Sequence, residues 1–110
     1  MIMQKLKLRV TIDRPIGFED SYGNIYPINY GFVPGVIGGD GEEQDVYVIS
    51  KHAIVPLEVF EGILVAVIRR KNDNEDKWIV TSEDEFLSKK EIFEKTRFLE
   101  QYFDSAIELL

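Results

Sequence analysis

Four acidic side chains lie close together near the middle of the chain, directly after a glycine-rich segment. These residues, the acidic turn, are Asp40, Glu42, Glu43 and Asp45, within six positions. Carboxylates at this density repel one another unless they face open water or a cation binds between them. Such a set of oxygen ligands suits a hard cation such as Mg²⁺. The acidic turn therefore predicts a metal site, with a plain solvated turn as the alternative.

A longer motif surrounds the acidic turn. It consists of YPINYGF over residues 26–32 and DGEEQDVYVI over residues 40–49. The motif resembles the signature of the soluble family I inorganic pyrophosphatases, Tyr-Pro-x-Asn-Tyr-Gly followed by Asp-Gly-Asp-Pro-x-Asp-Val. The chain departs from it where Glu42 replaces an aspartate and Glu43 replaces a proline. The resemblance implies Mg-dependent hydrolysis of inorganic pyrophosphate to phosphate by metal-activated water.

The resemblance also implies a role for individual side chains. These roles are metal binding by Asp40, Asp45, Glu75 and Asp73, catalysis by Glu42 and Tyr30, and phosphate binding by Lys77 and Tyr102. Glu42 takes the position of the family's water-activating aspartate, and its extra methylene displaces the carboxylate. A displacement of about 1 Å can lower a rate by about a hundredfold. The segment that carries Asp73 and Glu75 is also typical of an ordinary polar hairpin loop.

Two phosphate-binding features of the family are missing. Residues 14–25 are too few for the active-site hairpin that carries a Lys, a Glu and an Arg in the family. Phe103 stands where the family has a lysine after the tyrosine. Arg14 is the only cation among residues 14–25, and a guanidinium at a strand end can bind phosphate bidentately. The alternative is a surface ion pair with Asp13 or Glu19.

Further positive charge lies at Arg69, Arg70 and Lys71. Because successive side chains of a strand point to opposite faces, at most one of Arg69 and Arg70 is expected to face the site. The single histidine, His52, is expected to be a surface or turn residue.

The elements that position these residues are mainly strands. Apolar and polar residues alternate over residues 5–13, which predicts a strand with one buried face. The apolar runs at residues 46–49 and 63–68 predict buried strands. Residues 63–70 and 77–81 predict a β-hairpin with a charged tip, and residues 33–41 predict a turn rich in Pro and Gly.

One helix is expected at the C-terminal end. Ser88 and Glu91 have the capping-box spacing that begins a helix. Apolar residues then recur at helical spacing, at Ile92, Thr96, Leu99, Phe103, Ala106 and Leu110. The expected fold is α+β and mainly β: a small closed or partly open OB-like β-barrel with a C-terminal α-helix packed on it, forming a single domain over residues 1–110.

Composition restricts the possible partners. The chain has 110 residues, no cysteine and a net charge of −7. The negative charge argues against nucleic acid as a partner, and the lack of cysteine excludes disulfides and thiolate metal sites. No apolar segment is long enough for a membrane span or a signal peptide, so a cytoplasmic protein without a membrane partner is expected. Because the relatives assemble into oligomers, a homo-oligomer is possible.

Three functions remain open at this stage. The first is hydrolysis of pyrophosphate with Mg²⁺. The second is hydrolysis of another phosphoanhydride or of a phosphate ester on the same scaffold, in a cleft that the missing hairpin leaves open to a larger substrate. The third is a non-catalytic module that binds metal or phosphate, which the missing cations favour.

Overall fold

A computed structural model describes residues 5–71 and 75–110 of the chain. These residues form six strands and one helix. Their bounds are β1 Lys7–Arg14, β2 Asn29–Ile37, β3 Glu43–Val48, β4 Val59–Arg70, β5 Asp76–Thr81, α1 Lys89–Glu100 and β6 Ser105–Leu109.

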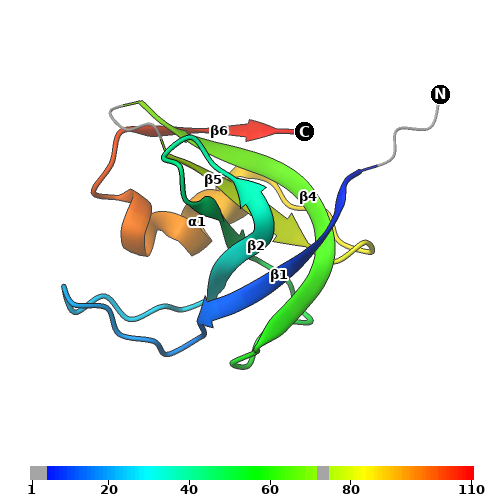
Figure 1. Cartoon of the computed structure of the whole chain (residues 1–110), viewed down its shortest axis with the longest axis horizontal. Coiled ribbons are helices and arrows are strands. Elements are labelled where there is room, and N and C mark those ends of the chain that lie inside the picture. Colours follow the sequence, from blue (N-terminus) through cyan, green and yellow to red (C-terminus); the bar gives the residue numbers. More distant parts are fainter. Residues whose placement is uncertain (1–4, 72–74) are drawn as a thin grey trace.

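The strands form a closed, mixed β-barrel. Neighbouring strands follow the order β1-β2-β3-β5-β4-β6, and an additional pairing of β1 with β4 closes five of them into a ring. All pairs are antiparallel except β3 with β5, which run parallel. β4 is the long curved strand that wraps around the barrel, and β6 lies alongside its C-terminal half (Figure 1). The barrel predicted from the sequence is therefore confirmed.

Two glycines allow the barrel to close tightly. A Cβ atom at Gly31 would lie 1.8 Å from the carbonyl oxygen of Thr11, where β1 and β2 pair. A Cβ atom at Gly62 would lie 2.3 Å from the carbonyl oxygen of Thr81, close to the point where β4 passes from β1 to β5. Both positions accept only glycine without a shift of the backbone.

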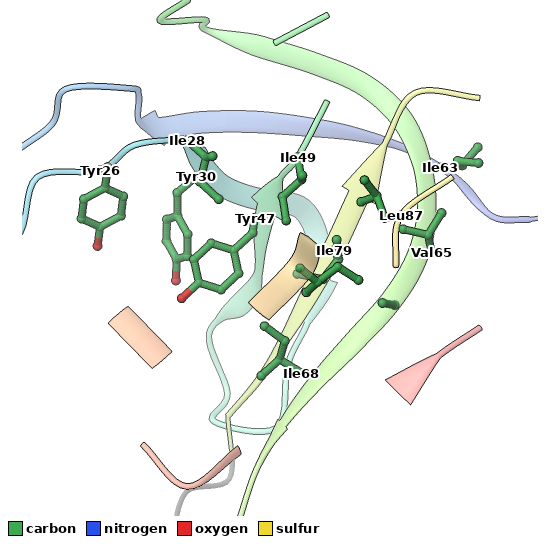
Figure 2. Packing of buried hydrophobic residues seen from close by; sticks show 12 residues of the cluster. Tyr26, Ile28, Tyr30, Tyr47, Ile49, Ile63, Val65, Ile68, Ile79 and Leu87 are labelled. Atoms are coloured by element: carbon green, nitrogen blue, oxygen red, sulfur yellow. The ribbon is translucent and has the colours of Figure 1, made fainter. Parts of the chain in front are cut away.

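The barrel and the helix enclose two groups of buried apolar side chains. One group includes Tyr26, Tyr30, Tyr47, Ile68 and Ile79, and α1 covers it with Ile92. In this group the hydroxyl groups of the three tyrosines point to the same side (Figure 2). The phenol rings therefore belong to the core, while their polar ends lie together at its edge.

The helix begins as predicted and ends earlier than expected. Ser88 caps α1 and forms the capping box with Glu91. The last helical residue is Glu100, and the predicted continuation to Leu110 is wrong, because Ser105–Leu109 pairs with β4. Pairing with the open side of β4 overrides the helical spacing there. No helix in the described part of the chain is long and apolar enough to cross a membrane.

A second correction concerns the segment before the acidic turn. The predicted turn over residues 33–41 is largely strand, because β2 continues to Ile37. Its pairing with β3 shifts register between Val33 and Ile37, and this irregularity accommodates Pro34 and Gly35. Gly35 has a φ of 81°, which favours glycine. The turn itself is confined to residues 38–42.

Candidate active site

A cleft of about 660 Å³ opens at one end of the barrel. Its walls come from the ends of β1 and β4, the starts of β2, β3 and β5, the loop between β1 and β2, and the segment around the end of α1. The lining residues are Asp13, Arg14, Asp20, Tyr22, Asn24, Tyr26, Tyr30, Asp45, Arg70, Glu75, Lys77, Leu99, Tyr102 and Phe103. The volume lies within the range of small-molecule sites, about 300–1,000 Å³.

Lys77 is the centre of the cleft's polar network. Its side chain is 4% exposed. The Nζ atom donates hydrogen bonds to Asp45 Oδ2 at 2.6 Å and to Tyr30 Oη at 2.8 Å. It also contacts the carboxylate of Glu75. An ammonium group with three donors is satisfied by this arrangement, and it is held at the base of the cleft by β5.

The carboxyl groups of Asp45 and Glu75 also interact with each other. Burial raises the pKa of Glu75, and its hydrogen bond with Asp45 acts in the same direction. Burial opposes ionisation of Asp45, but hydrogen bonds from Glu75 and Lys77 outweigh it and lower the pKa of Asp45. The two carboxyl groups therefore titrate as a pair in which Asp45 is the stronger acid.

Tyr30 links this network to the apolar core. Burial raises the pKa of its hydroxyl far above the ordinary value, and the negative charge of Asp45 adds to the effect. The phenol therefore stays neutral, so it accepts the hydrogen bond from Lys77 while it can donate to Asp45. Tyr30 of β2 therefore orients the side chains of Asp45 on β3 and Lys77 on β5.

Arg14 supplies a second cation at the cleft. It lies at the end of β1, and its Nη1 donates to Tyr26 Oη at 2.6 Å. The guanidinium carbon lies 5.4–5.9 Å from the ring centroids of Phe18, Tyr26 and Tyr30. Aromatic faces therefore hold the guanidinium in place. No ion pair of Arg14 with Asp13 or Glu19 is found among the described residues.

The loop between β1 and β2 forms one wall. A bridge between Glu19 and Ile25 makes it a small hairpin-shaped loop. Asp20 organises its tip by accepting hydrogen bonds from the backbone of Tyr22 and Asn24. The loop places Tyr22 and Asn24 at the cleft, and no cation besides Arg14 comes from residues 14–25.

Tyr102 follows α1 and also lines the cleft, with 64% of the side chain exposed. It lies beyond the end of the helix, in which the sequence had predicted it. The amide of Tyr102 donates to the carbonyl of Leu99, so the last turn tightens and turns the chain away from the helix axis.

Three of the four residues of the acidic turn, Asp40, Glu42 and Glu43, lie outside the cleft lining. Asp40 and Glu42 are exposed at the β2–β3 connection, and Asp40 Oδ1 accepts a hydrogen bond from the Glu42 amide at 3.0 Å. Of the acidic turn, Asp45 alone lines the cleft. It lies within β3, beyond the connection between β2 and β3. Asp73, the remaining predicted metal ligand, lies outside the described residues.

The cleft contains oxygen donors of the kind that Mg²⁺ prefers, supplied by Asp45 and Glu75. Over residues 5–71 and 75–110, however, no group of three or more acidic or histidine side chains converges as a metal site. The ammonium of Lys77 lies against both carboxylates instead. The two carboxylates therefore fit Mg²⁺ in the type of their ligand atoms, and Lys77 occupies the position next to them.

Three further charged residues at or near the cleft are Asp13, Arg70 and Glu100. Asp13 is exposed at the cleft, yet its partial burial raises its pKa, and nearby Asp45 adds to this. Glu100 falls one helical turn after Thr96 on the buried side of α1, and this spacing was the available signal. Of the two adjacent arginines, Arg70 faces the cleft and Arg69 is exposed, as strand alternation predicts.

His52 is exposed, as expected, and its ring interacts with Asp84 at 3.2 Å. It plays no part in the cleft.

Comparison with protein families matches residues 5–107 to the family described as inorganic pyrophosphatase. The chain therefore belongs to the inorganic pyrophosphatase family. Among curated relatives, the inorganic pyrophosphatase of Aeropyrum pernix is 43% identical over 49 residues, covering 44% of this chain and 28% of the relative. That of Sulfolobus acidocaldarius is 39% identical over 56 residues, covering 50% of this chain and 32% of the relative. These alignments span about a third or less of the relatives' length.

Solved structures agree on the fold. The inorganic pyrophosphatase of Ehrlichia chaffeensis superposes with a TM-score of 0.71 at 19% identity, covering 94% of this chain and 85% of that one. That of Helicobacter pylori superposes with a TM-score of 0.62 at 21% identity, covering 98% and 86%. At this identity the likeness establishes the barrel fold.

Proposed function

We propose that this chain is a Mg-dependent inorganic diphosphatase that hydrolyses pyrophosphate to phosphate. The observation that carries the proposal is the network of Lys77, Asp45, Glu75 and Tyr30 at the base of the cleft. It combines a cation for phosphate with carboxylates for a metal, and it lies in a chain that belongs to the inorganic pyrophosphatase family.

Asp45 and Glu75 would hold Mg²⁺, which would supply positive charge to the phosphate oxygens and acidify the attacking water. Lys77, released from the two carboxylates when these hold the metal, would bind the phosphate oxygens together with Arg14, and the exposed hydroxyl of Tyr102 would donate to them. Tyr30 would keep Lys77 oriented. Asp40, Glu42 and Asp73 remain predicted contributors, and the first two would have to reach the cleft from the acidic turn.

The test is phosphate release from pyrophosphate with Mg²⁺ by the purified chain. Asp45→Asn and Lys77→Met should lower the rate about a hundredfold or more. Asp84→Asn is the matched control, because Asp84 is exposed and lies outside the cleft, and it should act like the unaltered chain. Absence of phosphate release by a folded, unaltered chain would overturn the proposal.

A second candidate function is hydrolysis of a phosphoanhydride or phosphate ester larger than pyrophosphate. It is favoured by the cleft's volume and by the exposed tyrosines Tyr22 and Tyr102, which offer apolar surface that pyrophosphate does not need. Faster turnover of nucleotides or sugar phosphates than of pyrophosphate would favour it.

The third candidate is a non-catalytic module. The position of Glu42 outside the cleft lining favours it. Its signature would be binding of Mg²⁺ or phosphate without hydrolysis of any phosphate compound tested.

A further inference from the structure

Arg70 is a buried cation on the wall of the cleft. Its side chain, at the end of β4, is 5% exposed. Nε and Nη2 donate to the two carboxylate oxygens of Glu100, at 3.1 and 2.6 Å. The guanidinium carbon lies 3.6 Å from the ring centroid of Phe103. Glu100 and Phe103 therefore fix the plane and direction of the guanidinium group of Arg70.

Glu100 has a second hydrogen-bond partner. The hydroxyl of Tyr47 donates to Glu100 Oε2 at 2.6 Å. Burial raises the pKa of Tyr47 far above its ordinary value, and the charge of Glu100 adds to this, so the phenol remains a donor. The carboxylate thus has two fixed partners and cannot turn away from Arg70 without leaving a buried donor unsatisfied.

Stability alone gives little reason for this arrangement. Burying an ion pair removes both groups from water, and apolar residues of similar size usually serve a core as well or better. The place of Arg70 offers another reason. Its Nη1 lies on the side of Glu75, 3.6 Å from Oε2, and Arg70, Glu75 and Lys77 line the same cleft.

Phe103 fits this interpretation. A lysine at position 103, as in the pattern of the family, would place a second positive charge against Arg70. A phenyl ring instead presents its face to the guanidinium and holds it by cation–π attraction. A positive charge is therefore absent at position 103 but present beside it at position 70, at the end of β4.

We propose that Arg70 binds a phosphoryl group of the substrate in this cleft and that Glu100 and Phe103 position its guanidinium for this. The proposal rests on the proposed function, under which the cleft binds pyrophosphate. The ligand class is a phosphate group that accepts hydrogen bonds from the guanidinium on the side of Nη1, because Nε and Nη2 are paired with Glu100.

The experiment compares binding of two probes, inorganic phosphate followed by ³¹P NMR and imidodiphosphate with Mg²⁺ followed by calorimetry, because the P–N–P bridge of this pyrophosphate analogue resists hydrolysis. Arg70→Gln combined with Glu100→Gln removes both buried charges together, so no unpaired charge is left in the core. It should weaken binding of both probes by about tenfold or more. Arg70→Lys keeps the charge and removes the planar fork, and it should weaken binding by roughly fivefold.

The matched control is Arg69→Gln. Arg69 is the adjacent residue of β4 and is exposed, with ion pairs to Asp76 and Glu108. It should bind both probes within about twofold of the unaltered chain. Circular dichroism and urea unfolding establish that each variant is folded.

Three outcomes are distinguishable. Weaker binding by both Arg70 variants, with the control unaffected, supports the proposal. Binding unchanged in both Arg70 variants shows that Arg70 is structural and overturns it, while the proposed function stands. If the unaltered chain binds neither probe, the proposed function and this inference fail together.

Discussion

The ammonium of Lys77 lies 2.6 Å from the Asp45 carboxylate, although the two residues are on parallel neighbouring strands 32 positions apart. β3 and β5 pair through Val46 and Trp78, which places the residues just before them side by side. The parallel pairing of the barrel thus creates the contact between the two groups.

Removal of the Lys77 ammonium should destabilise the chain. In Lys77→Met, Asp45 and Glu75 would face each other without the buried cation between them. We expect a loss of about 3 kcal/mol in the free energy of unfolding near neutral pH, since breaking a buried pair leaves uncompensated charge. Urea unfolding measures this. Lys7→Met, at an exposed ion pair with Glu83, should change stability by less than about 1 kcal/mol, and equal losses in both variants would contradict the argument.

Asn29 should be essential for the fold rather than for chemistry. Its side chain is fully buried, and Oδ1 accepts from the amides of Ile16 and Leu57. Its amide nitrogen donates to the carbonyls of Ala53 and Val55. Asn29→Ala leaves these groups without partners and should cost about 2–4 kcal/mol in unfolding free energy. Gln101→Ala, at an exposed position, is the control, and a loss below 1 kcal/mol in Asn29→Ala would show that water replaces the side chain.

The strands of the barrel could be predicted where local pattern and burial agree. Alternation over residues 5–13 predicted β1, and the apolar runs predicted β3, β4 and β5. β2 was not predicted, because Pro34 and Gly35 are typical of turns. Its pairing with β3 accommodates them through a shift of register. β6 was not predicted either, because Ala106 and Leu110 continue a helical spacing, and pairing with the open side of β4 is what favours a strand there.

The candidate site could be predicted in part. The motif pointed to Asp45, Tyr30 and Lys77, which the fold brings together. It also pointed to Asp40 and Glu42, yet sequence adjacency does not decide which side of a turn meets the cleft. The pair of Arg70 with Glu100 joins residues 30 positions apart, and local patterns carry no information on such a contact.

Glu85 should make stability depend on pH. Its partial burial opposes ionisation, but hydrogen bonds from the Lys51 amide, Ser50 and Thr81 outweigh this and lower its pKa to about 2. The ordinary value is 4.5, so the folded chain binds this proton less tightly than the unfolded chain does. The stabilisation is therefore complete above about pH 4.5 and is lost as the pH falls toward 2.

Glu85→Gln tests this dependence. At pH 7 the variant should lose about 1–2 kcal/mol in unfolding free energy, a value reduced for the partial exposure of the side chain. The difference from the unaltered chain should shrink on acidification toward pH 2, as measured by urea unfolding across the range. Glu94→Gln, on the exposed side of α1, should show no such change. A difference that stays constant with pH would exclude the carboxylate charge as the cause.

Arg14 should be needed for phosphate binding, and the hydroxyl group of Tyr26 should matter less than the charge of Arg14. Arg14→Ala removes a cleft cation and should weaken binding of inorganic phosphate by about tenfold or more. Tyr26→Phe removes only the hydroxyl that accepts from Nη1, while the rings around the guanidinium remain, so about a threefold loss is expected. Titration by ³¹P NMR measures both. Equal phosphate affinity in Arg14→Ala and in the unaltered chain would show that Arg14 serves only to pack the aromatic rings. In that case Arg14→Ala should lower the midpoint of urea unfolding.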